Sequence, residues 1–218
     1  MAATSPRTRL PREDRMEQTL AAAHALFAER GYAAVKMDEI AAAVGVTKPL
    51  LYNYFGNKEQ LYIACMERAG DSLTATVAEA VTASANPGEA LGAGVRAFFS
   101  FLDSDRAAWA VLFDETLPHG GEIADRVAEY RHRIVELVSG SLLAQLPQDR
   151  RDAVRVEFEA LSTALLGAAE ALARWWLRTQ EIGADEAAEL LISTIEPGLR
   201  ARSASPTPNT TDQGNKNS

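Results

Sequence analysis

The side chains best suited to contact a nucleic acid lie together in one short run of the chain, from Lys48 to Tyr54. This run combines a cation, hydroxyl groups, an amide and aromatic rings. Lys and Tyr side chains can hold phosphate oxygens, Asn can bind an adenine edge, and a Leu side chain or a Thr methyl can pack on the thymine methyl group. The composition favours a DNA-binding surface, although the ordinary wet face of a small core helix would also explain it.

Two short helices are expected to position this run. The apolar stripe of the first one has helical spacing and consists of Met37, Ile40, Ala41 and Val44. Gly45 can end that helix in the left-handed conformation, and the Thr47 side chain can cap the next one. Leu51 and Phe55, four residues apart, can bury one face of the second helix. Two helices joined by a tight glycine turn form a helix-turn-helix.

At these residues the chain resembles a known family. The run from Gly31 to Tyr62, GYAAVKMDEIAAAVGVTKPLLYNYFGNKEQLY, resembles the DNA-binding domain of the TetR family of bacterial transcriptional regulators. The resemblance covers about the first 68 residues. The family commonly has Thr or Ser where this chain has Lys36, and often Thr where it has Leu50. The side-chain cap of the first short helix is therefore expected to be lost, and the operator sequence is expected to be the chain's own.

The resemblance implies that the helix from Thr47 to Tyr54 lies in the major groove of double-stranded DNA. The predicted DNA-binding residues are Lys36, Thr47, Lys48, Pro49, Leu50, Tyr52, Asn53, Tyr54 and Lys58. Of these, Lys48, Tyr52, Tyr54 and Lys58 are expected mainly to anchor phosphates, and Thr47, Pro49, Leu50 and Asn53 to face the bases. Asn57 and Gln60 have the spacing of a capping box, so Lys58 in the same turn is expected to strengthen a phosphate site.

Taken over the whole chain, the net charge of −8 opposes DNA binding, but the two parts of the chain differ in charge. Residues 1–68 hold nine Lys and Arg against eight Asp and Glu, whereas the remaining residues hold thirteen against twenty-two. The acidic character therefore belongs to the second part, and a bulk isoelectric point does not argue against DNA as a partner.

Several other classes of protein find no support. The single cysteine, Cys65, excludes an internal disulfide framework and fits a reducing cytoplasm, and no paired Cys and His spacing suggests zinc. The longest apolar run, Ala160 to Leu177, is interrupted by Glu170 and Arg174, so no membrane span is expected. Glycine-rich phosphate loops, H-E-x-x-H and G-x-S-x-G are absent. We therefore expect no enzyme, cofactor or metal; the alternative to a DNA-binding regulator is a helix-turn-helix architectural or adaptor protein without an effector.

The whole chain is expected to be all-α. Helical patterns without strand alternation predict a first helix over 10–30, a fourth helix up to about residue 84, and five more after Asn86-Pro87-Gly88. The expected organisation is a flexible basic arm over 1–9, a three-helix DNA-binding domain over 10–68, a helical effector-binding and dimerisation domain over 69–203, and a disordered tail over 204–218. The arm either follows a DNA groove or is an inert solvated tail. Pro197 and Gly198 are expected to kink or stop the last helix.

The resemblance implies that the two long helices near the end form a four-helix bundle with their copies in a second subunit. The predicted interface residues are Phe158, Leu161, Leu165, Ala169, Leu172, Leu191 and Ile195. A plain core would explain one apolar stripe on each helix equally well. Further apolar residues point in other directions: Leu166, Trp175, Leu190 and Ile192. They favour a second buried surface, and hence a homodimer.

Aromatic residues are frequent between the fourth helix and those two long helices. Such residues at helical spacing are more often simple core, but the resemblance implies a cavity for a small-molecule effector, apolar or aromatic in character. The predicted lining residues are Phe98, Phe101, Trp109, Phe113, Tyr130 and Trp175. Asp114 and Glu115 either pair with a cationic effector or belong to a solvated face.

Overall fold

A computed structural model describes residues 11–84, 87–114, 116–118 and 120–204 of the 218-residue chain. The predicted arm over 1–9 and Glu115 lie outside the described residues, and so does the predicted tail, apart from Ala204.

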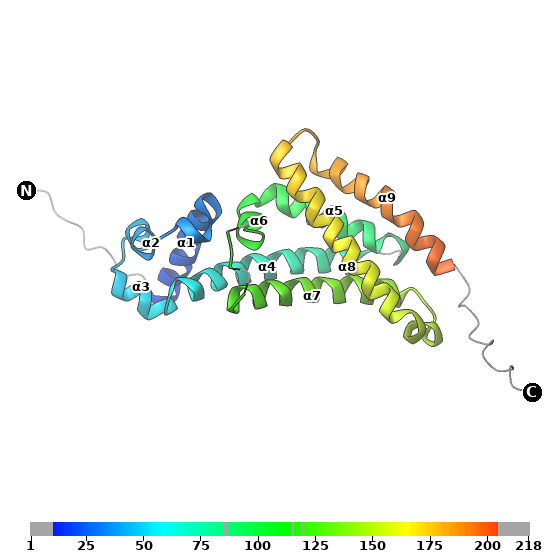
Figure 1. Cartoon of the computed structure of the whole chain (residues 1–218), viewed down its shortest axis with the longest axis horizontal. Coiled ribbons are helices and arrows are strands. Elements are labelled where there is room, and N and C mark those ends of the chain that lie inside the picture. Colours follow the sequence, from blue (N-terminus) through cyan, green and yellow to red (C-terminus); the bar gives the residue numbers. More distant parts are fainter. Residues whose placement is uncertain (1–10, 85–86, 115, 119, 205–218) are drawn as a thin grey trace, which may run out of the picture.

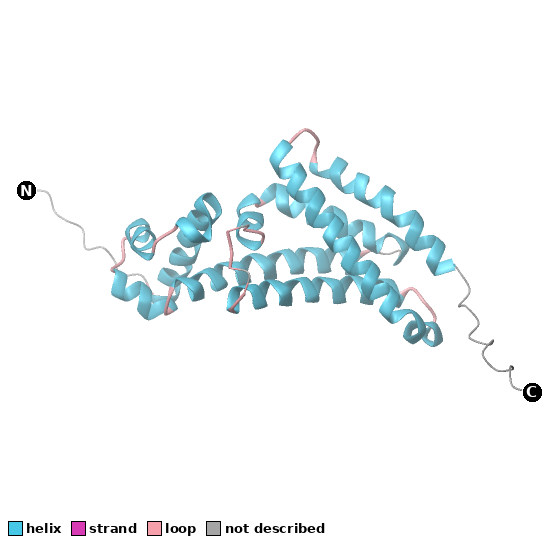
Figure 2. Ribbon diagram, viewed as in Figure 1, coloured by secondary structure: helices cyan, strands magenta, loops and turns pink. Residues whose placement is uncertain are grey.

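The described residues are helical and include no strand, which confirms the all-α prediction (Figure 2). The helices are α1 Arg12–Ala34, α2 Met37–Val44, α3 Lys48–Phe55, α4 Lys58–Ala83, α5 Pro87–Ser104, α6 Arg106–Leu112, α7 Glu122–Ala144, α8 Gln148–Thr179 and α9 Ala184–Ala204. Helices α1 to α3 form one end of an elongated molecule, and α5 to α9 form a bundle around the rest of α4 (Figure 1).

Helix α4 joins the two ends without interruption. It has 26 residues, and at 1.5 Å per residue it is about 39 Å long. The proposed domain boundary between residues 68 and 69 therefore falls inside a continuous helix. A displacement of α4 in the bundle would move the helices packed on its first turns, because a helix transmits motion along its axis.

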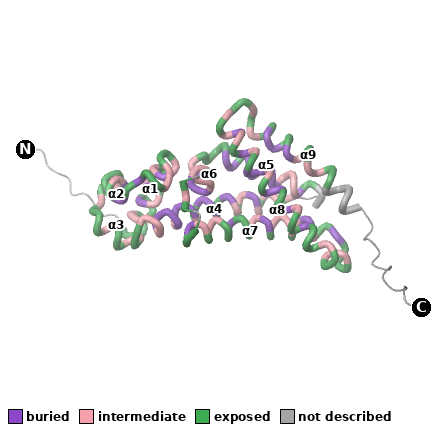
Figure 3. Tube along the Cα trace, viewed as in Figure 1, coloured by how far each residue is buried: buried purple, intermediate pink, exposed green. Residues whose placement is uncertain are grey.

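Buried residues also extend from the end formed by α1 to α3, here called the small end, into the bundle (Figure 3). Phe27, Ile40 and Leu51 of the small end belong to the same core cluster as Phe99 and Trp176 of the bundle. A second, smaller cluster lies at the far end of the bundle and consists of Leu142, Leu146 and Phe158. The small end is thus packed against the bundle instead of being tethered to it by a loop.

Two predicted helix ends differ from the structure. Gly31 has φ 75° and ψ 162°, which breaks the helical backbone as expected, but helical residues resume and α1 ends at Ala34. Of the two outcomes expected at Pro197 and Gly198, a kink or a stop, the stop is wrong, because α9 continues to Ala204 with Pro197 inside it. Ser193 and Pro197 are both exposed, so a carbonyl freed by the missing proline N–H can bind water. Within the described ranges, no helix is long and apolar enough to span a bilayer.

Candidate nucleic-acid interface and ligand cavities

Helices α2 and α3 are joined by a tight turn that a left-handed glycine and two backbone hydrogen bonds define. Gly45 adopts φ 71° and ψ 33°, the left-handed conformation that a glycine reaches without steric cost. The N–H groups of Gly45 and Val46 donate to the carbonyls of Ala42 and Ala41, at 3.2 and 3.0 Å. These bonds satisfy the last carbonyls of α2. The prediction that Gly45 ends the first short helix is confirmed.

Helix α3 buries one face and exposes the other. Leu51 is fully buried and Phe55 is half-buried, as their spacing predicted. The side chains predicted to meet DNA are all accessible: Thr47, Lys48, Pro49, Tyr52 and Asn53 are exposed, and Leu50 and Tyr54 are half-buried. The exposed face is therefore the one that carries the side chains predicted to hold phosphates and to face the bases.

The caps of these two helices differ from the prediction. Thr47 stands at the N-cap of α3, but its side chain makes no capping hydrogen bond, so the expected cap is wrong. Lys36 provides no side-chain cap for α2 either, as expected. Glu39 compensates from inside the helix, since its Oε2 accepts from the Lys36 N–H at 2.8 Å. The signal for this contact was the acidic residue three positions after Lys36.

The cations around α3 have partners within the protein. Lys48 forms an exposed ion pair with Asp38 of α2, with Nζ and Oδ1 2.9 Å apart. Lys58 is half-buried: its Nζ lies 4.4 Å from the centre of the Tyr32 ring and donates to the Ala33 carbonyl at 3.4 Å. Burial lowers the pKa of Lys58 from its ordinary value. A phosphate contact by Lys58 therefore requires its side chain to turn away from Tyr32.

The expected capping box at the start of α4 is half right. Asn57 accepts from the Gln60 N–H at 2.8 Å, so the cap itself is confirmed. The Gln60 side chain does not reach back, because its Nε2 donates to Glu122 Oε2 at 2.6 Å. Glu122 opens α7, so this contact ties the start of α4 to the bundle. Sequence spacing alone contained no signal for a partner 62 residues away.

The end of α6 holds the small end of the molecule through direct hydrogen bonds. Asp114 Oδ2 accepts from the Tyr32 N–H at 2.6 Å, directly after the break at Gly31. The buried Tyr62 hydroxyl donates to the Val111 carbonyl at 2.6 Å. Asp114 thus serves the backbone of α1, and the suggestion that it belongs to a simple solvated face is wrong.

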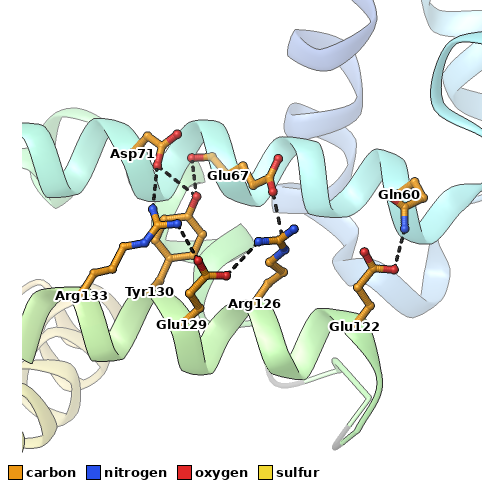
Figure 4. Close-up of polar contacts among 8 residues, drawn as sticks. All are labelled: Gln60, Glu67, Asp71, Glu122, Arg126, Glu129, Tyr130 and Arg133. Carbon is orange, nitrogen blue, oxygen red and sulfur yellow. Dashed lines mark hydrogen bonds and ion pairs between the residues drawn. The ribbon is translucent and has the colours of Figure 1, made fainter.

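Helices α4 and α7 are joined by a ladder of polar contacts, which Figure 4 shows side by side. Arg126 approaches Glu67 at 3.7 Å, and the Tyr130 hydroxyl donates to Asp71 Oδ1 at 3.1 Å. Burial raises the pKa of Tyr130 to about 12, and the Asp71 carboxylate adds to that shift. The Tyr130 ring lies against Gly70, where an added Cβ would be 2.6 Å from ring Cε1. The two helices therefore approach closely where a glycine leaves room.

Among the cavities lined by described residues of α7 and α8, three share lining residues with one another. The inner cavity, of about 60 Å³, is lined by Val77, Val81, Leu91, Gly94, Val95, Phe98, Ile134, Val138, Ser141, Leu142, Ser162, Leu165, Leu166 and Ala169. The middle cavity is lined by Met66, Gly70, Leu73, Leu112, Phe113, Val127, Tyr130, Arg131, Ile134 and Glu170. The outer pocket, of about 280 Å³, is lined by Leu112, Phe113, Asp114, Leu117, Pro118, Ile123, Ala124, Val127, Ala128, Arg131 and Arg174.

The predicted pocket residues are divided among these cavities. Phe98 lines the inner cavity, Tyr130 the middle one, and Phe113 both the middle cavity and the outer pocket. Phe101 and Trp109 line none of the three: Phe101 is core, and Trp109 stacks on Phe113 with ring centres 4.0 Å apart. Trp175 does not line them either; it is half-buried against the main core. Aromatic type was therefore a poor guide, because most of the inner lining is aliphatic.

The family follows from both parts of the chain. Residues 20–65 match a family model described as bacterial regulatory proteins, tetR family, and residues 87–196 match one described as tetracyclin repressor-like, C-terminal domain. The chain belongs to the TetR family. The resemblance found at Gly31 to Tyr62 is thereby confirmed, and it extends to the bundle.

Named relatives of this TetR-family chain are transcriptional regulators. It is 39% identical over 119 residues to the transcriptional activator FasR of Mycolicibacterium smegmatis, a match that covers 55% of this chain and 54% of FasR. It is 33% identical over 138 residues to the regulator BetI of Rhizobium meliloti, covering 62% and 66%. The chain thus spans less than two thirds of the length of either relative. These names agree with the prediction that the chain is not an enzyme.

Solved structures match over a larger share. A TetR-like transcriptional regulator from Rhodococcus sp. RHA1 has a TM-score of 0.71 and 34% identity, covering 88% of this chain and 99% of that one. AibR, solved in complex with isovaleryl coenzyme A and operator DNA, has a TM-score of 0.67 and 26% identity, covering 84% and 98%. The fold of the described helices is thus similar, over most of the chain, to that of a TetR-like transcriptional regulator.

The expected dimer residues of this TetR-family chain only partly lie on its surface. Phe158, Leu165, Ala169 and Leu191 are buried inside the subunit, which leaves them little surface to offer a partner. Leu161, Leu172 and Ile195 are half-buried. The stripe assigned to the partner was instead the stripe that packs α8 and α9 onto the bundle.

Another face of α8 is exposed and apolar. Its residues follow one another at intervals of three or four and are Ala153, Val156, Ala160, Ala164, Gly167 and Ala171. Val156 is 68% exposed, and Leu190 on α9 is 50% exposed. This spacing was available in the sequence, but alanine and glycine give a weak apolar signal beside Phe and Leu.

Proposed function

We propose that this TetR-family chain is a transcriptional repressor. As a homodimer it binds a palindromic operator, and it leaves the operator when a small-molecule effector binds in the second domain. The observation that carries the proposal is the α3 surface, where Thr47, Lys48 and Asn53 are exposed while Leu51 anchors the helix from behind.

The operator geometry follows from the helix-turn-helix. Each subunit of the dimer lays α3 in a major groove, with base contacts from Thr47, Pro49, Leu50 and Asn53. Phosphates are held by Lys36, by Lys48, and by Lys58 after it has turned from Tyr32. Two-fold symmetry then requires two inverted half-sites about 34–36 Å apart or a little more.

The exposed stripe of α8 supports the homodimer. Small side chains such as Ala164 and Gly167 allow two helices to approach closely, and Val156 and Leu190 add apolar area that water otherwise covers. We propose that this stripe, together with the outer side of α9, pairs with its copy across a two-fold axis.

The effector is proposed to act through α4 and the end of α6. The inner cavity lies between α4, α5, α7 and α8, and Phe113 and Asp114 line the outer pocket beside the hydrogen bond to Tyr32. A ligand that favours a different placement of these elements changes the separation of the two α3 helices. Binding reciprocity then requires that DNA weakens effector binding by the same factor. AibR, solved in complex with isovaleryl coenzyme A and operator DNA, supports the part of this proposal that one protein binds both a small molecule and an operator.

The test is selection of bound sequences from a random DNA pool by the purified full chain at two salt concentrations. We expect enrichment of an inverted repeat, with tighter binding at low salt. A transcription assay on the recovered operator then distinguishes repression from activation.

A chain that is dimeric and folded but enriches no sequence would contradict the proposal and favour the adaptor alternative. Dimerisation is measured separately by sedimentation. Val156→Glu with Leu190→Glu should produce monomers, and Glu157→Gln on an adjacent position of α8 serves as the control for a surface change.

A further inference from the structure

We propose that the effector is an amphipathic anion, with its apolar chain in the inner cavity and its anionic head between Arg131 and Arg174 in the outer pocket. This inference rests on the proposed function, because it names the chemical class of the effector. It is carried by the order in which α7 and α8 present side chains along the three cavities.

One face of α7 runs through all three cavities. Val127, Arg131, Ile134, Val138 and Ser141 follow at intervals of four, three, four and three, which places them on a single stripe. Ile134 lines both the inner and the middle cavity, and Arg131 lines both the middle cavity and the outer pocket. From Arg131 to Ser141 the stripe is about 15 Å long at 1.5 Å per residue. The cavities are thus consecutive along the helix.

The facing stripe of α8 has the same order. Arg174 lines the outer pocket, Glu170 the middle cavity, and Leu166 and Ser162 the inner cavity, each four residues from the next. On both helices an arginine lines the outer pocket and an aliphatic side chain, Ile134 or Leu166, lines the inner cavity, and on α8 Glu170 lies between the two. The pattern defines a polar end and an apolar end for any ligand that occupies the whole path.

The inner end suits a hydrocarbon chain. Among its lining residues only Ser141 and Ser162 carry a side-chain hydroxyl, and Ser162 Oγ already donates to the Phe158 carbonyl at 2.8 Å. A polar group placed there would lose its hydrogen bonds to water and find few partners in their place. The volume of about 60 Å³ holds roughly four water-sized groups, so a longer chain has to displace Ile134 or its neighbours.

The outer end suits an anion. Arg131 binds Glu170 through Nε and one terminal nitrogen, at 2.9 and 3.0 Å, which fixes the guanidinium and leaves further N–H donors for a second acceptor. The Glu170 side chain is only 12% exposed and lies on the inner side, whereas the Arg131 side chain is 46% exposed. The charged residues lining the outer pocket are Arg131, Arg174 and Asp114. Glu170 offsets the charge of Arg131, and Asp114 already accepts from the N–H groups of Tyr32 and Thr116. The pocket can therefore offer a ligand further N–H donors of Arg131, whereas its carboxylate is already engaged, and this favours an anionic head over a cationic one.

The Asp114 carboxylate also connects the pocket that holds the ligand head with the DNA-binding end of the molecule. It accepts from the N–H groups of Tyr32 and Thr116, at 2.6 and 2.7 Å, and it faces the pocket that the head enters. A second negative charge beside Asp114 is repelled by it. Movement of Asp114, at the end of α6, away from the head relieves this repulsion. Because Asp114 accepts from the Tyr32 N–H, the same movement displaces that hydrogen bond.

The experiment is calorimetric titration of the full chain, without DNA, using decanoate, decanol, decylamine and decanoyl coenzyme A. We expect the decanoyl anion, free or as the thioester, to bind at least tenfold tighter than the alcohol and the amine. Comparison of decanoate with decanoyl coenzyme A distinguishes a carboxylate head from the phosphate groups of the coenzyme. Shorter acids should lose affinity by about fourfold per methylene, the factor for burying one CH₂. Equal affinity for decanol, or tighter binding of decylamine, would overturn the proposal.

Variants locate the two ends. Arg174→Gln should weaken anion binding about tenfold and leave decanol unchanged, whereas Arg178→Gln, one turn further along α8, should change neither. Arg131→Met is combined with Glu170→Leu, because removing the arginine alone would leave a buried carboxylate unpaired. Leu166→Trp should fill the inner cavity and weaken both ligands.

Unchanged anion affinity in both arginine variants would refute the head assignment. Operator binding of the same proteins is measured in parallel. A chain that selects an operator but ignores every decyl probe disproves this inference and leaves the proposed function intact.

Discussion

The recognition helix and the α7–α8 pair place their functional residues on opposite sides. In α3, Leu51 faces the core, and the residues proposed for DNA face water. In α7 and α8, the residues proposed for the apolar chain of the ligand line the inner cavity, whereas Arg131 and Arg174, proposed for its head, are exposed. The exposed side of α8 also carries small apolar residues. An outward site is fixed by one helix and its own periodicity. An inward site exists only where several helices meet, so its lining depends on how they pack.

The largest effect is expected where α3 is anchored. Leu51→Ala removes a fully buried side chain and should lower the free energy of unfolding by about 2–5 kcal/mol. The adjacent Leu50→Ala, at a half-buried position on the other face, should cost less than about 1 kcal/mol and instead weaken operator binding. Urea denaturation measures both. Equal destabilisation by the two variants would show that the division of faces is wrong.

The close approach of α4 and α7 provides the next test. Gly70→Ala places a Cβ 2.6 Å from the Tyr130 ring and should destabilise the fold by about 1–3 kcal/mol. Gly140→Ala is the matched control on α7, with no heavy atom within 4 Å of the new Cβ, and should stabilise by about 0.5–1 kcal/mol. Thermal unfolding compares them. If Gly70→Ala is as stable as the unchanged chain, the Tyr130 contact is not a tight one.

Base reading by α3 is tested through its amide. Asn53→Ala should cost about 1–3 kcal/mol on the selected operator and alter which base is preferred at one position of each half-site. Asn57→Ala removes only a helix cap, so it should cost about 1 kcal/mol of stability without changing the preferred sequence. Repeating the selection with both variants gives the readout. An unchanged preference in Asn53→Ala would remove that residue from the base-reading set.

The smallest effect concerns a single phosphate contact per subunit. Lys58→Ala should weaken binding to all sequences alike and flatten the dependence of affinity on salt by about one unit of slope per contact. Lys58→Arg should keep the slope, because the positive charge remains. Titrations of a random duplex at several salt concentrations measure it. If binding of the random duplex is unaffected by Lys58→Ala, Lys58 stays on the Tyr32 ring and does not hold a phosphate.

Local contacts were predictable because their partners are neighbours in sequence. The left-handed turn at Gly45, the buried Leu51 and the Asn57 cap all depend on spacings of at most four residues, and the structure contains each of them. Thr47 was a local prediction that failed, since a residue suited to capping need not use its side chain. Gln60 failed for a different reason, because Glu122 competes for it from a distant helix.

The amino-acid sequence by itself determined the helices, the turn at Gly45 and the face that α3 turns to solvent, since these follow from periodicity and short-range hydrogen bonding. The tertiary structure alone decided the rest. It buried Phe158 and Leu165 in the subunit, left Val156 exposed, aligned Arg131 with Arg174 at one end of the cavities, and placed Asp114 on Tyr32. An amphipathic helix specifies that one face is buried, but the neighbours that cover it are set by packing between helices far apart in the chain.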